Sequence, residues 1–341
     1  MNTFGRIFKI HIFGESHGTC VGITIDGCPP GILLAIEDFI PDIERRKGGT
    51  QKGTTPRKED DTPIFMSGIF NNKTTGAPLT IIFENKNIRT EDYEKQRAIP
   101  RPGHADFVAH HKYKGFEDYR GGGHFSGRLT LPLVAAGVVA KKVLDLASRS
   151  SPNKRGIEIK ASIIEIGGEK DIDKGLQKAI DAKDSVGGIV ECCVQGLPIG
   201  LGEPFFDSLE SLISHIIFAI PAVRGIEFGT GFPAARMFGS EHNDSIINEK
   251  GATSTNHAGG VIGGISNGNE CIFRIAVKPT SSTPQTQQSF NEQTQQVENF
   301  SIKGRHDLCI ALRVPVIVEA VTAIVLADCL APFNSPKGGR L

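Results

Sequence analysis

The segments PLVAAGVVAKKVLDLA, residues 132–147, and VPVIVEAVTAIVLADCL, residues 314–330, are two long apolar stretches of this 341-residue chain. Each has a proline near its start, where a helix does not need that residue's backbone N–H. In the first stretch apolar side chains recur at helical spacing. Arg313, Glu319 and Asp328 interrupt the second, so we do not expect it to span a membrane. We expect two helices that share one core.

The sequence around these two helices contains a weak internal repeat. The pattern Gly-x-Pro-x-Gly occurs at 27–31 and at 196–200, and an aspartate and a helix follow both copies at the same distance. A Gly-Ile-x-Asn pattern before a strand occurs at 68–71 and again at 264–267. Chance agreement among common turn residues is the alternative. The shared order favours one domain over residues 1–341, built from two pseudo-repeats at about 1–150 and 151–341.

Strands and helices both alternate with glycine-rich turns along the chain, which predicts an α+β fold. The expected strands are residues 4–13, 20–26, 63–70, 79–84, 157–166, 188–194 and 271–277. The expected further helices are residues 36–47 and 208–220. Residues 49–61 are expected to form a loop, and the Gln/Thr/Ser-rich residues 284–300 are assigned no element.

The composition of the chain indicates which kinds of partner, compartment and site to expect. The formal net charge is zero, which gives no reason to expect a nucleic-acid or acidic-membrane partner. The seven cysteines form no C-x-x-C motif, and an odd number fits poorly with a disulfide framework. No signal peptide is visible and no histidine or cysteine cluster has metal-ligand spacing, so we expect a cytoplasmic enzyme-sized protein without a metal site.

Three glycine-flanked histidine motifs are the strongest functional signal: GESHG at 14–18, RPGHAD at 101–106 and KGRHD at 303–307. Histidine changes its charge near neutral pH, and glycine lets the backbone approach a ligand closely. Arginine adds a planar fork of donors suited to carboxylate or phosphate. Each motif alone could be a surface turn. Together they predict one site that binds an anion and handles protons.

Two further segments favour anion binding. Residues 119–128, YRGGGHFSGR, lead into the first apolar helix, and their backbone N–H groups could receive a phosphate. Residues 278–282, KPTSS, place a lysine and three hydroxyls at the end of a strand. Neither segment is a dinucleotide fingerprint or a P-loop, and an ordinary loop is the alternative for both.

In this order, the motifs GESHG, RPGHADF, DYRGGG, NHAGG, GGIS-G, KPTSS and GRHD resemble those of the chorismate synthase family, from residue 13 to about 330. The resemblance implies a β-α-β sandwich, with a helical core between antiparallel sheets, and a homotetramer. It also implies a lyase that converts 5-enolpyruvylshikimate 3-phosphate to chorismate and phosphate by 1,4-anti elimination. Such an enzyme needs reduced FMN, here expected from an external NAD(P)H-dependent flavin reductase.

The same resemblance assigns roles to individual residues. His17 would meet the leaving phosphate, His104 would manage the protonation of the flavin, and Asp307 would act beside the flavin N5. In the third motif Arg305 and Asp307 therefore carry more weight than His306. The substrate-binding cations would be Arg46, Lys52, Arg57, Arg101 and Arg128. The flavin contacts would be His124, Phe125, Ser126, Pro221, Ala222, Gly263, Lys278, Pro279, Thr280, Ser281, Ser282 and Arg305.

The chain departs from the family pattern after its three glycines. The common form there is Arg-Ser-Ser-Ala-Arg, whereas residues 124–128 read His-Phe-Ser-Gly-Arg. Arg128 is kept, but the flavin contact of His124 and Phe125 is left open. Lys52 stands where arginine is frequent and lacks its bidentate fork. The rival interpretations are a metal-dependent phosphohydrolase and a non-catalytic protein that binds a phosphorylated ligand.

Overall fold

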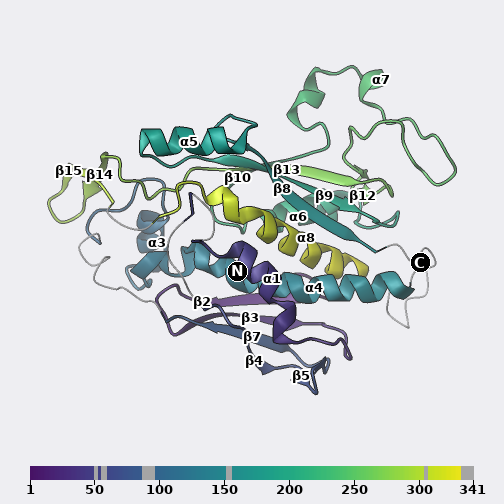
Figure 1. Cartoon of the computed structure of the whole chain (residues 1–341), viewed down its shortest axis with the longest axis horizontal. Coiled ribbons are helices and arrows are strands. Elements are labelled where there is room, and N and C mark those ends of the chain that lie inside the picture. The colour runs from purple at the N-terminus through teal and green to yellow at the C-terminus, as the bar shows by residue number, and fades with distance from the viewer. Residues whose placement is uncertain (50–52, 55–59, 87–96, 151–155, 303–305, 332–341) are drawn as a thin grey trace.

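A computed structural model describes residues 1–49, 53–54, 60–86, 97–150, 156–302 and 306–331. Two long helices, α4 (Thr130–Ser150) and α8 (Val314–Leu330), run side by side through the middle of the molecule (Figure 1). An antiparallel sheet lies on each side of this helix pair. The fold is α+β, and both expected apolar stretches are helices in its core.

The first sheet packs against α4 and has five strands. Val21, Ile23 and Ile25 alternate with more exposed residues along the third strand and are fully buried, as a half-buried strand requires. Ile23 pairs with Ile81 of the neighbouring strand, whose alternate residues are also buried. In sheet order, the strands are β1 (Thr3–Phe4), β2 (Lys9–Gly14), β3 (Cys20–Asp26), β7 (Leu79–Glu84) and β4 (Ile64–Ser67).

The second sheet packs against α8. Cys192 and Phe273 face each other across neighbouring strands, and both are fully buried. In sheet order, the strands are β10 (Val223–Phe228), β13 (Cys271–Val277), β9 (Gly188–Gln195) and β8 (Glu158–Ile166). All seven cysteines are free thiols.

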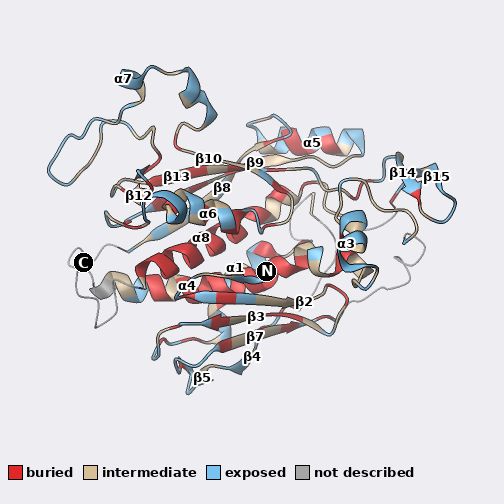
Figure 2. Ribbon diagram, turned by 180° about the vertical axis from the view of Figure 1, so that it is seen from behind, coloured by how far each residue is buried: buried red, intermediate tan, exposed pale blue. Residues whose placement is uncertain are grey.

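The two central helices approach each other closely at Gly137 and Ala320. A Cβ atom built on Gly137 would lie 2.3 Å from the Cβ of Ala320, so only glycine allows this crossing. Every residue of α8 except Pro315 is buried, and Figure 2 shows both helices largely in the colour of buried residues. Residues 310–330 are long and apolar enough to cross a membrane, but here they lie inside the protein core.

Two buried carboxylates of α8 are fully engaged by other parts of the chain. Glu319 accepts a bidentate pair of hydrogen bonds from Arg45, at 2.7 and 2.8 Å. Asp328 accepts hydrogen bonds from the backbone N–H groups of residues 6–8. Buried charges require such partners, and these contacts fasten both α1 (Ile40–Arg46) and the N-terminal segment to the central helix.

The two halves of the chain repeat one detail of hydrogen bonding. The hydroxyl of Thr74 donates to the carbonyl of Pro29 at 2.6 Å, and the hydroxyl of Ser266 donates to the carbonyl of Pro198 at the same distance. Each hydroxyl also accepts a hydrogen bond from the N–H three residues after its proline, at 3.0 and 2.9 Å. Each Gly-x-Pro-x-Gly turn is therefore joined in the same way to a two-stranded hairpin, at residues 69–74 in the first half and 261–266 in the second.

Some expected elements differ in the structure. The strand expected over 4–13 is broken, because Gly5 has a φ of +96° and the N–H groups of residues 6–8 are taken by Asp328. The helix expected over 36–47 divides at Phe39 into a 3-10 turn and α1. Residues 284–300, which were assigned no element, contain a hairpin of β14 (Gln287–Asn291) and β15 (Gln296–Phe300).

The remaining elements are short or lie around this core. The helices are α1 (Ile40–Arg46), α3 (Asp106–Tyr113), α5 (Ile172–Ala182), α6 (Leu209–Ile217) and α7 (Gly239–His242). The short strands are β5 (Ile69–Phe70), β6 (Lys73–Thr74), β11 (Val261–Ile262), β12 (Ile265–Ser266), β14 (Gln287–Asn291) and β15 (Gln296–Phe300). The 3-10 helices are Ile36–Asp38, Arg120–Phe125, Gly127–Leu129, Phe205–Asp207, Phe232–Arg236 and Ile310–Arg313.

A long arm that carries α7 extends away from the second sheet (Figure 1). Its apolar side chains Phe232, Phe238, Ile246 and Ile247 are all exposed. Exposed apolar side chains that gather on one segment are typical of a protein–protein contact.

Candidate functional site

A cavity of about 720 Å³ lies where the first turns of α4 and α8 meet loops from both halves of the chain. Thr130 and Leu133 of α4 and Val314 and Ile317 of α8 contribute to its wall. The start of a helix carries partial positive charge, so this position favours an anionic ligand. The volume is within the range of small-molecule sites.

The cavity brings together most of the predicted site residues. Those that line it are His17, Arg46, Arg101, His104, His124, Phe125, Ser126, Arg128, Pro221, Ala222, Lys278, Pro279, Thr280, Ser281, Ser282 and Asp307. Lys52, Arg57 and Arg305 lie outside the described residues. Gly263 does not line the cavity: it lies in the tight turn between β11 and β12, where its φ of +61° suits glycine.

His17 is held between the end of β2 and the glycine turn at 121–123. Its side chain is almost completely buried. A Cβ atom built on Gly121 would lie 2.2 Å from the Cε1 and Nδ1 atoms of the His17 ring. The backbone N–H of Ser16 also donates to the carbonyl of Gly123 at 3.1 Å. The first histidine motif and the glycine turn therefore fit together as one unit.

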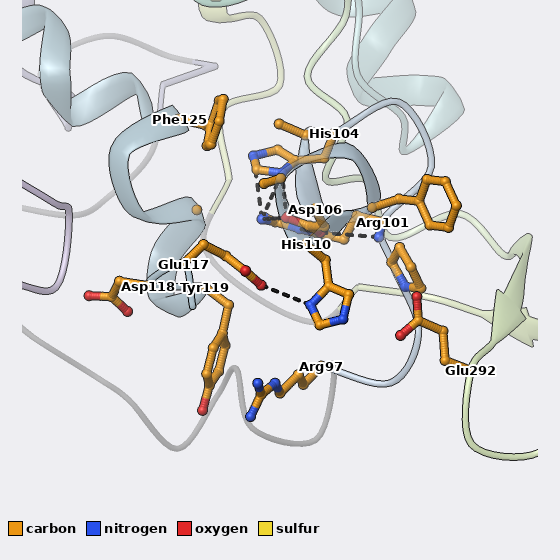
Figure 3. A pocket seen from close by; sticks show the side chains of 15 residues that line it. Arg97, Arg101, His104, Asp106, His110, Glu117, Asp118, Tyr119, Phe125 and Glu292 are labelled. Atoms are coloured by element: carbon orange, nitrogen blue, oxygen red, sulfur yellow. Dashed lines mark hydrogen bonds and ion pairs between the residues drawn. The ribbon is translucent and has the colours of Figure 1, made fainter. Parts of the chain in front are cut away.

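His104 rests on the next glycine of the same turn. A Cβ atom built on Gly122 would lie 3.0 Å from the Cε1 of His104. Its Nδ1 lies 2.5 Å from the carboxylate of Asp106, which Arg101 also contacts (Figure 3). Burial raises the pKa of Asp106, but hydrogen bonds from Arg101 and His104 outweigh burial and hold that pKa well below its usual range.

Arg46 and Arg128 form a buried cationic cluster around one carboxylate. Asp61 lies 2.8 Å from the Nη1 of Arg128 and 3.6 Å from the Nη1 of Arg46, and all three side chains are buried. Arg128 also donates to the side-chain oxygen of Asn85 at 2.5 Å. Burial and the neighbouring Arg313 lower the pKa of Arg46, although Asp61 opposes this. The sequence did not identify Asp61 as a site residue, because no local pattern around it shows that Arg46 and Arg128 contact it.

Asp307 and His306 come from the third motif. Asp307 accepts a hydrogen bond from the Nη1 of Arg313 at 3.0 Å, and the Nε of Arg313 donates to the carbonyl of Arg46. His306 also lines the cavity, and its Nε2 is buried without a hydrogen-bond partner among the described residues. Burial, reinforced by Arg101, lowers the pKa of His306 and favours its neutral form.

The KPTSS segment meets the RPGHAD loop at the cavity wall. Lys278 and Ser281 donate to the carbonyl of Gly103, at 3.1 and 2.8 Å. The Nζ of Lys278 also donates to the hydroxyl of Ser281 at 2.7 Å. Burial lowers the pKa of Lys278, and the nearby Arg224 adds to the effect. No carboxylate in the described part of the chain forms an ion pair with Lys278, so its charge is available to a ligand.

His124, which departs from the family pattern, has protein partners on both ring nitrogens. Its Nδ1 lies 2.8 Å from the carbonyl of Gly14, and its Nε2 lies 3.1 Å from the side-chain oxygen of Asn2. Phe125 is only partly covered and has a tilted contact with the ring of Tyr113. A ligand at this turn would therefore meet the apolar ring of Phe125, next to His124, whose ring nitrogens already have hydrogen-bond partners in the protein.

Taken as a whole, the large cavity is cationic. Its cations are Arg46, Lys47, Arg101, Arg128, Lys278 and Arg313, and its carboxylates are Asp61 and Asp307. The apolar side chains of Ile12 and Ile310 also contribute to the wall. This combination suits ligands with several negative charges and a flat apolar part. Across the described residues, no three histidine, cysteine or acidic side chains gather into a group able to hold a metal ion.

Comparisons with known proteins agree on one family. The sequence model of chorismate synthase matches residues 8–331. The chorismate synthase of Chitinophaga pinensis is 66% identical over 328 residues, which is 96% of each chain. The chorismate synthase of Methanocaldococcus jannaschii is 41% identical over 373 residues, covering 99% of this chain and 97% of its own. A crystal structure of chorismate synthase shares the fold, with a TM-score of 0.71 and 24% identity over 96% of this chain and 92% of that one.

Proposed function

Because the chain belongs to the chorismate synthase family, we propose that its large cationic cavity is the place where 5-enolpyruvylshikimate 3-phosphate is converted to chorismate and phosphate. The protein is a lyase of the shikimate pathway and acts at the last step common to the aromatic amino acids. The observation that carries the proposal is that His17 and His104 rest on adjacent glycines at the edge of this cavity. Two residues able to exchange protons thus flank one anion site.

The reaction breaks a C–O bond to phosphate and a C–H bond on the opposite face of the same ring. The electron pair of the C–O bond leaves with the phosphate, and a new C=C bond completes the diene. Phosphate departs more readily when a donor meets its oxygens, and we assign that donor to His17. Arg46 and Arg128 hold the anionic groups of the substrate, with Lys52 and Arg57 as further candidates outside the described residues.

The chemistry of the wall residues fits a flavin phosphate. Lys278 and the hydroxyls of Ser281 and Ser282 suit the phosphate, and the segments 124–126 and 221–222 suit the ring. When bound, reduced FMN supplies the electron-rich ring that allows these bonds to break without net redox change. With the flavin bound, His104 would hold a proton on the cofactor side of the cavity, and Asp307, which accepts a hydrogen bond from Arg313, would accept one.

Three wider proposals follow from the family. Reduced FMN comes from an external NAD(P)H-dependent reductase. The protein is cytoplasmic, in keeping with seven free thiols. It assembles as a homotetramer, and the exposed apolar side chains of the arm around α7 offer a contact between copies.

We also propose that the fold is a β-α-β sandwich made by internal duplication. The two Gly-x-Pro-x-Gly turns, with the same hydroxyl-to-carbonyl hydrogen bond in each half, support this proposal. A single domain of two pseudo-repeats, at about 1–150 and 151–341, accounts for the central position of the two proline-initiated helices.

An anaerobic assay tests the proposed reaction. Purified protein with 5-enolpyruvylshikimate 3-phosphate and dithionite-reduced FMN is expected to form chorismate, and oxidised FMN alone is expected to support none. Equal product with oxidised FMN, or no product with reduced FMN, would refute the proposal. Phosphate release that needs a divalent ion would favour a phosphohydrolase, and binding without turnover would favour a phospho-ligand binding protein.

A further inference from the structure

Asp106 is the centre of a compact cluster that lines a small cavity of about 60 Å³ (Figure 3). Its partners Arg101 and His104 also line the large cavity. Its carboxylate accepts a hydrogen bond from the backbone N–H of Arg101 at 3.1 Å. It also accepts hydrogen bonds from the Nε and Nη2 of the same arginine, at 2.7 Å each. The Nδ1 of His104 completes the set at 2.5 Å. Both carboxylate oxygens are therefore occupied by cationic or polar donors.

This arrangement determines which ring nitrogen of His104 carries a proton. The hydrogen bonds from Arg101 and His104 lower the pKa of Asp106 despite its burial, so the carboxylate is ionised at neutral pH. An ionised carboxylate can only accept hydrogen bonds. The Nδ1 of His104 must then be the donor in both charge states of the imidazole, and Nε2 is the nitrogen that gains or loses a proton.

The ring is also fixed in orientation. A Cβ atom on Gly122 would lie 3.0 Å from the Cε1 and 3.2 Å from the Nε2 of His104, so the glycine leaves just enough space for this edge of the ring. The Nη2 of Arg101 lies within 3.3 Å of both ring nitrogens. The ring is therefore confined between the carboxylate, the guanidinium and the glycine turn.

We propose that Asp106 is a positioning residue that keeps the Nδ1 of His104 protonated, so that Nε2 alone exchanges protons in the large cavity. This inference rests on the proposed role of His104. Arg101, which is expected to hold the substrate, also acts on His104 through Asp106. A proton that reaches Nε2 gives an imidazolium hydrogen-bonded to the carboxylate, and its departure restores the neutral ring, so Asp106 itself is never protonated.

Nitrogen NMR of the full-length protein, labelled with ¹⁵N-histidine and free of ligand, tests the tautomer directly. A His104→Gln variant assigns the signals. We expect a protonated Nδ1 in the unsubstituted protein, and a mixture or reversal of tautomers in Asp106→Asn, because an amide can donate as well as accept. Asp118→Asn is the matched control, since Asp118 also pairs with an arginine through two hydrogen bonds at 2.8 Å but accepts no hydrogen bond from a histidine within the described part of the chain. An unchanged tautomer in Asp106→Asn overturns the proposal.

Kinetics give a second readout. Asp106→Asn is expected to lower kcat roughly 100-fold, the scale of a positioned proton transfer, with little change in the KM for substrate. Asp106→Glu keeps the charge and is expected to retain the tautomer and part of the activity. If Asp106→Asn does not fold, the Arg101→Lys variant is measured in its place. We expect this variant to have a lower kcat. A large rise in KM alone would instead indicate that Arg101 binds the substrate. The NMR result stands even if the enzyme assay fails, so the two proposals can fail separately.

Discussion

The imidazole of His17 packs directly against the backbone of Gly121, so closely that a Cβ atom there would lie 2.2 Å from two ring atoms. Such a distance is far inside van der Waals contact. The glycine turn therefore sets the position of His17, and the chemistry of the site depends on a residue that has no side chain.

Replacing Gly121 with alanine is expected to displace His17 and lower kcat at least ~100-fold, because a misplaced donor loses its orientation. The φ of +59° adds a backbone cost of about 1 kcal/mol. Gly31→Ala is the control, since Gly31 also has a positive φ but nothing within 4 Å of its Cβ position. Thermal unfolding and steady-state kinetics separate the two effects. Similar kcat values in both variants would contradict the assigned role of the turn.

His17→Ala and His104→Ala are each expected to reduce turnover severely while the protein remains folded. Both rings lie at the cavity, so their loss removes donors from the site without opening the core between the sheets. The exposed His11, whose Nδ1 is hydrogen-bonded to Thr3 at the surface, provides the control variant His11→Ala. Near-normal turnover in both active-site variants, measured under reduced FMN, would contradict their roles.

Asp61→Asn is expected to destabilise the protein by about 3–5 kcal/mol, because it leaves two buried arginines without their counter-charge. Inorganic phosphate should raise the melting temperature of this variant more than that of the unsubstituted protein, since an anion can replace the lost carboxylate. Asp60→Asn is the neighbouring control, with an exposed carboxylate 3.9 Å from Lys86. Equal stability of the two variants would argue against a shared counter-ion.

Gly137→Ala tests the close crossing of the two central helices. In an ordinary helix interior, a change from glycine to alanine stabilises the helix by about 1 kcal/mol. Here the new methyl group would lie 2.3 Å from the Cβ of Ala320. We expect a net loss of about 1–3 kcal/mol in the free energy of unfolding, as for other overpacked cores. The double variant Gly137→Ala with Ala320→Gly should recover little of this loss in denaturant titrations, because the Cα of residue 320 would still lie 2.5 Å from the new methyl group. A stabilised single variant would disprove the tight crossing.

The lowered pKa of Asp106 gives a pH dependence with a definite sign. A carboxyl whose folded pKa is depressed stabilises the protein above its unfolded pKa, near 3.9, and loses that contribution as the pH falls towards the folded value. The stability advantage of the unsubstituted protein over Asp106→Asn should therefore be present above about pH 5 and should shrink below about pH 4, as Asp106 gains a proton. An advantage that grows as the pH falls below about 4 would contradict an ionised Asp106.

Local patterns predicted the framework of this protein well. Proline-started apolar stretches identified α4 and α8, and alternation identified β3 (Cys20–Asp26) and β13 (Cys271–Val277) with their observed bounds. The hairpin β14–β15 was missed, because its residues are polar on both faces and carry no hydrophobic alternation.

The motifs also identified most of the cavity wall, but not the pairing of its charges. In the sequence, Arg313 was recognised only as a charged residue at the start of an apolar stretch. In the structure it contacts Asp307 and the backbone of Arg46. Asp61 and Asn85 reach Arg128 from other parts of the chain. Such contacts depend on how the sheets and helices pack together, and no local spacing reports them.

The place of α8 near the end of the chain affects how the protein is made. During synthesis the first sheet emerges from the ribosome long before the helix that completes the core. The N–H groups of residues 6–8 can form their hydrogen bonds only after Asp328 has been made, 322 positions beyond Arg6. Until then the nascent polypeptide exposes apolar strands, a state that favours aggregation and chaperone capture. Truncation before α8 should therefore leave no partially active fragment, and a premature stop codon there should be equivalent to loss of the whole gene product.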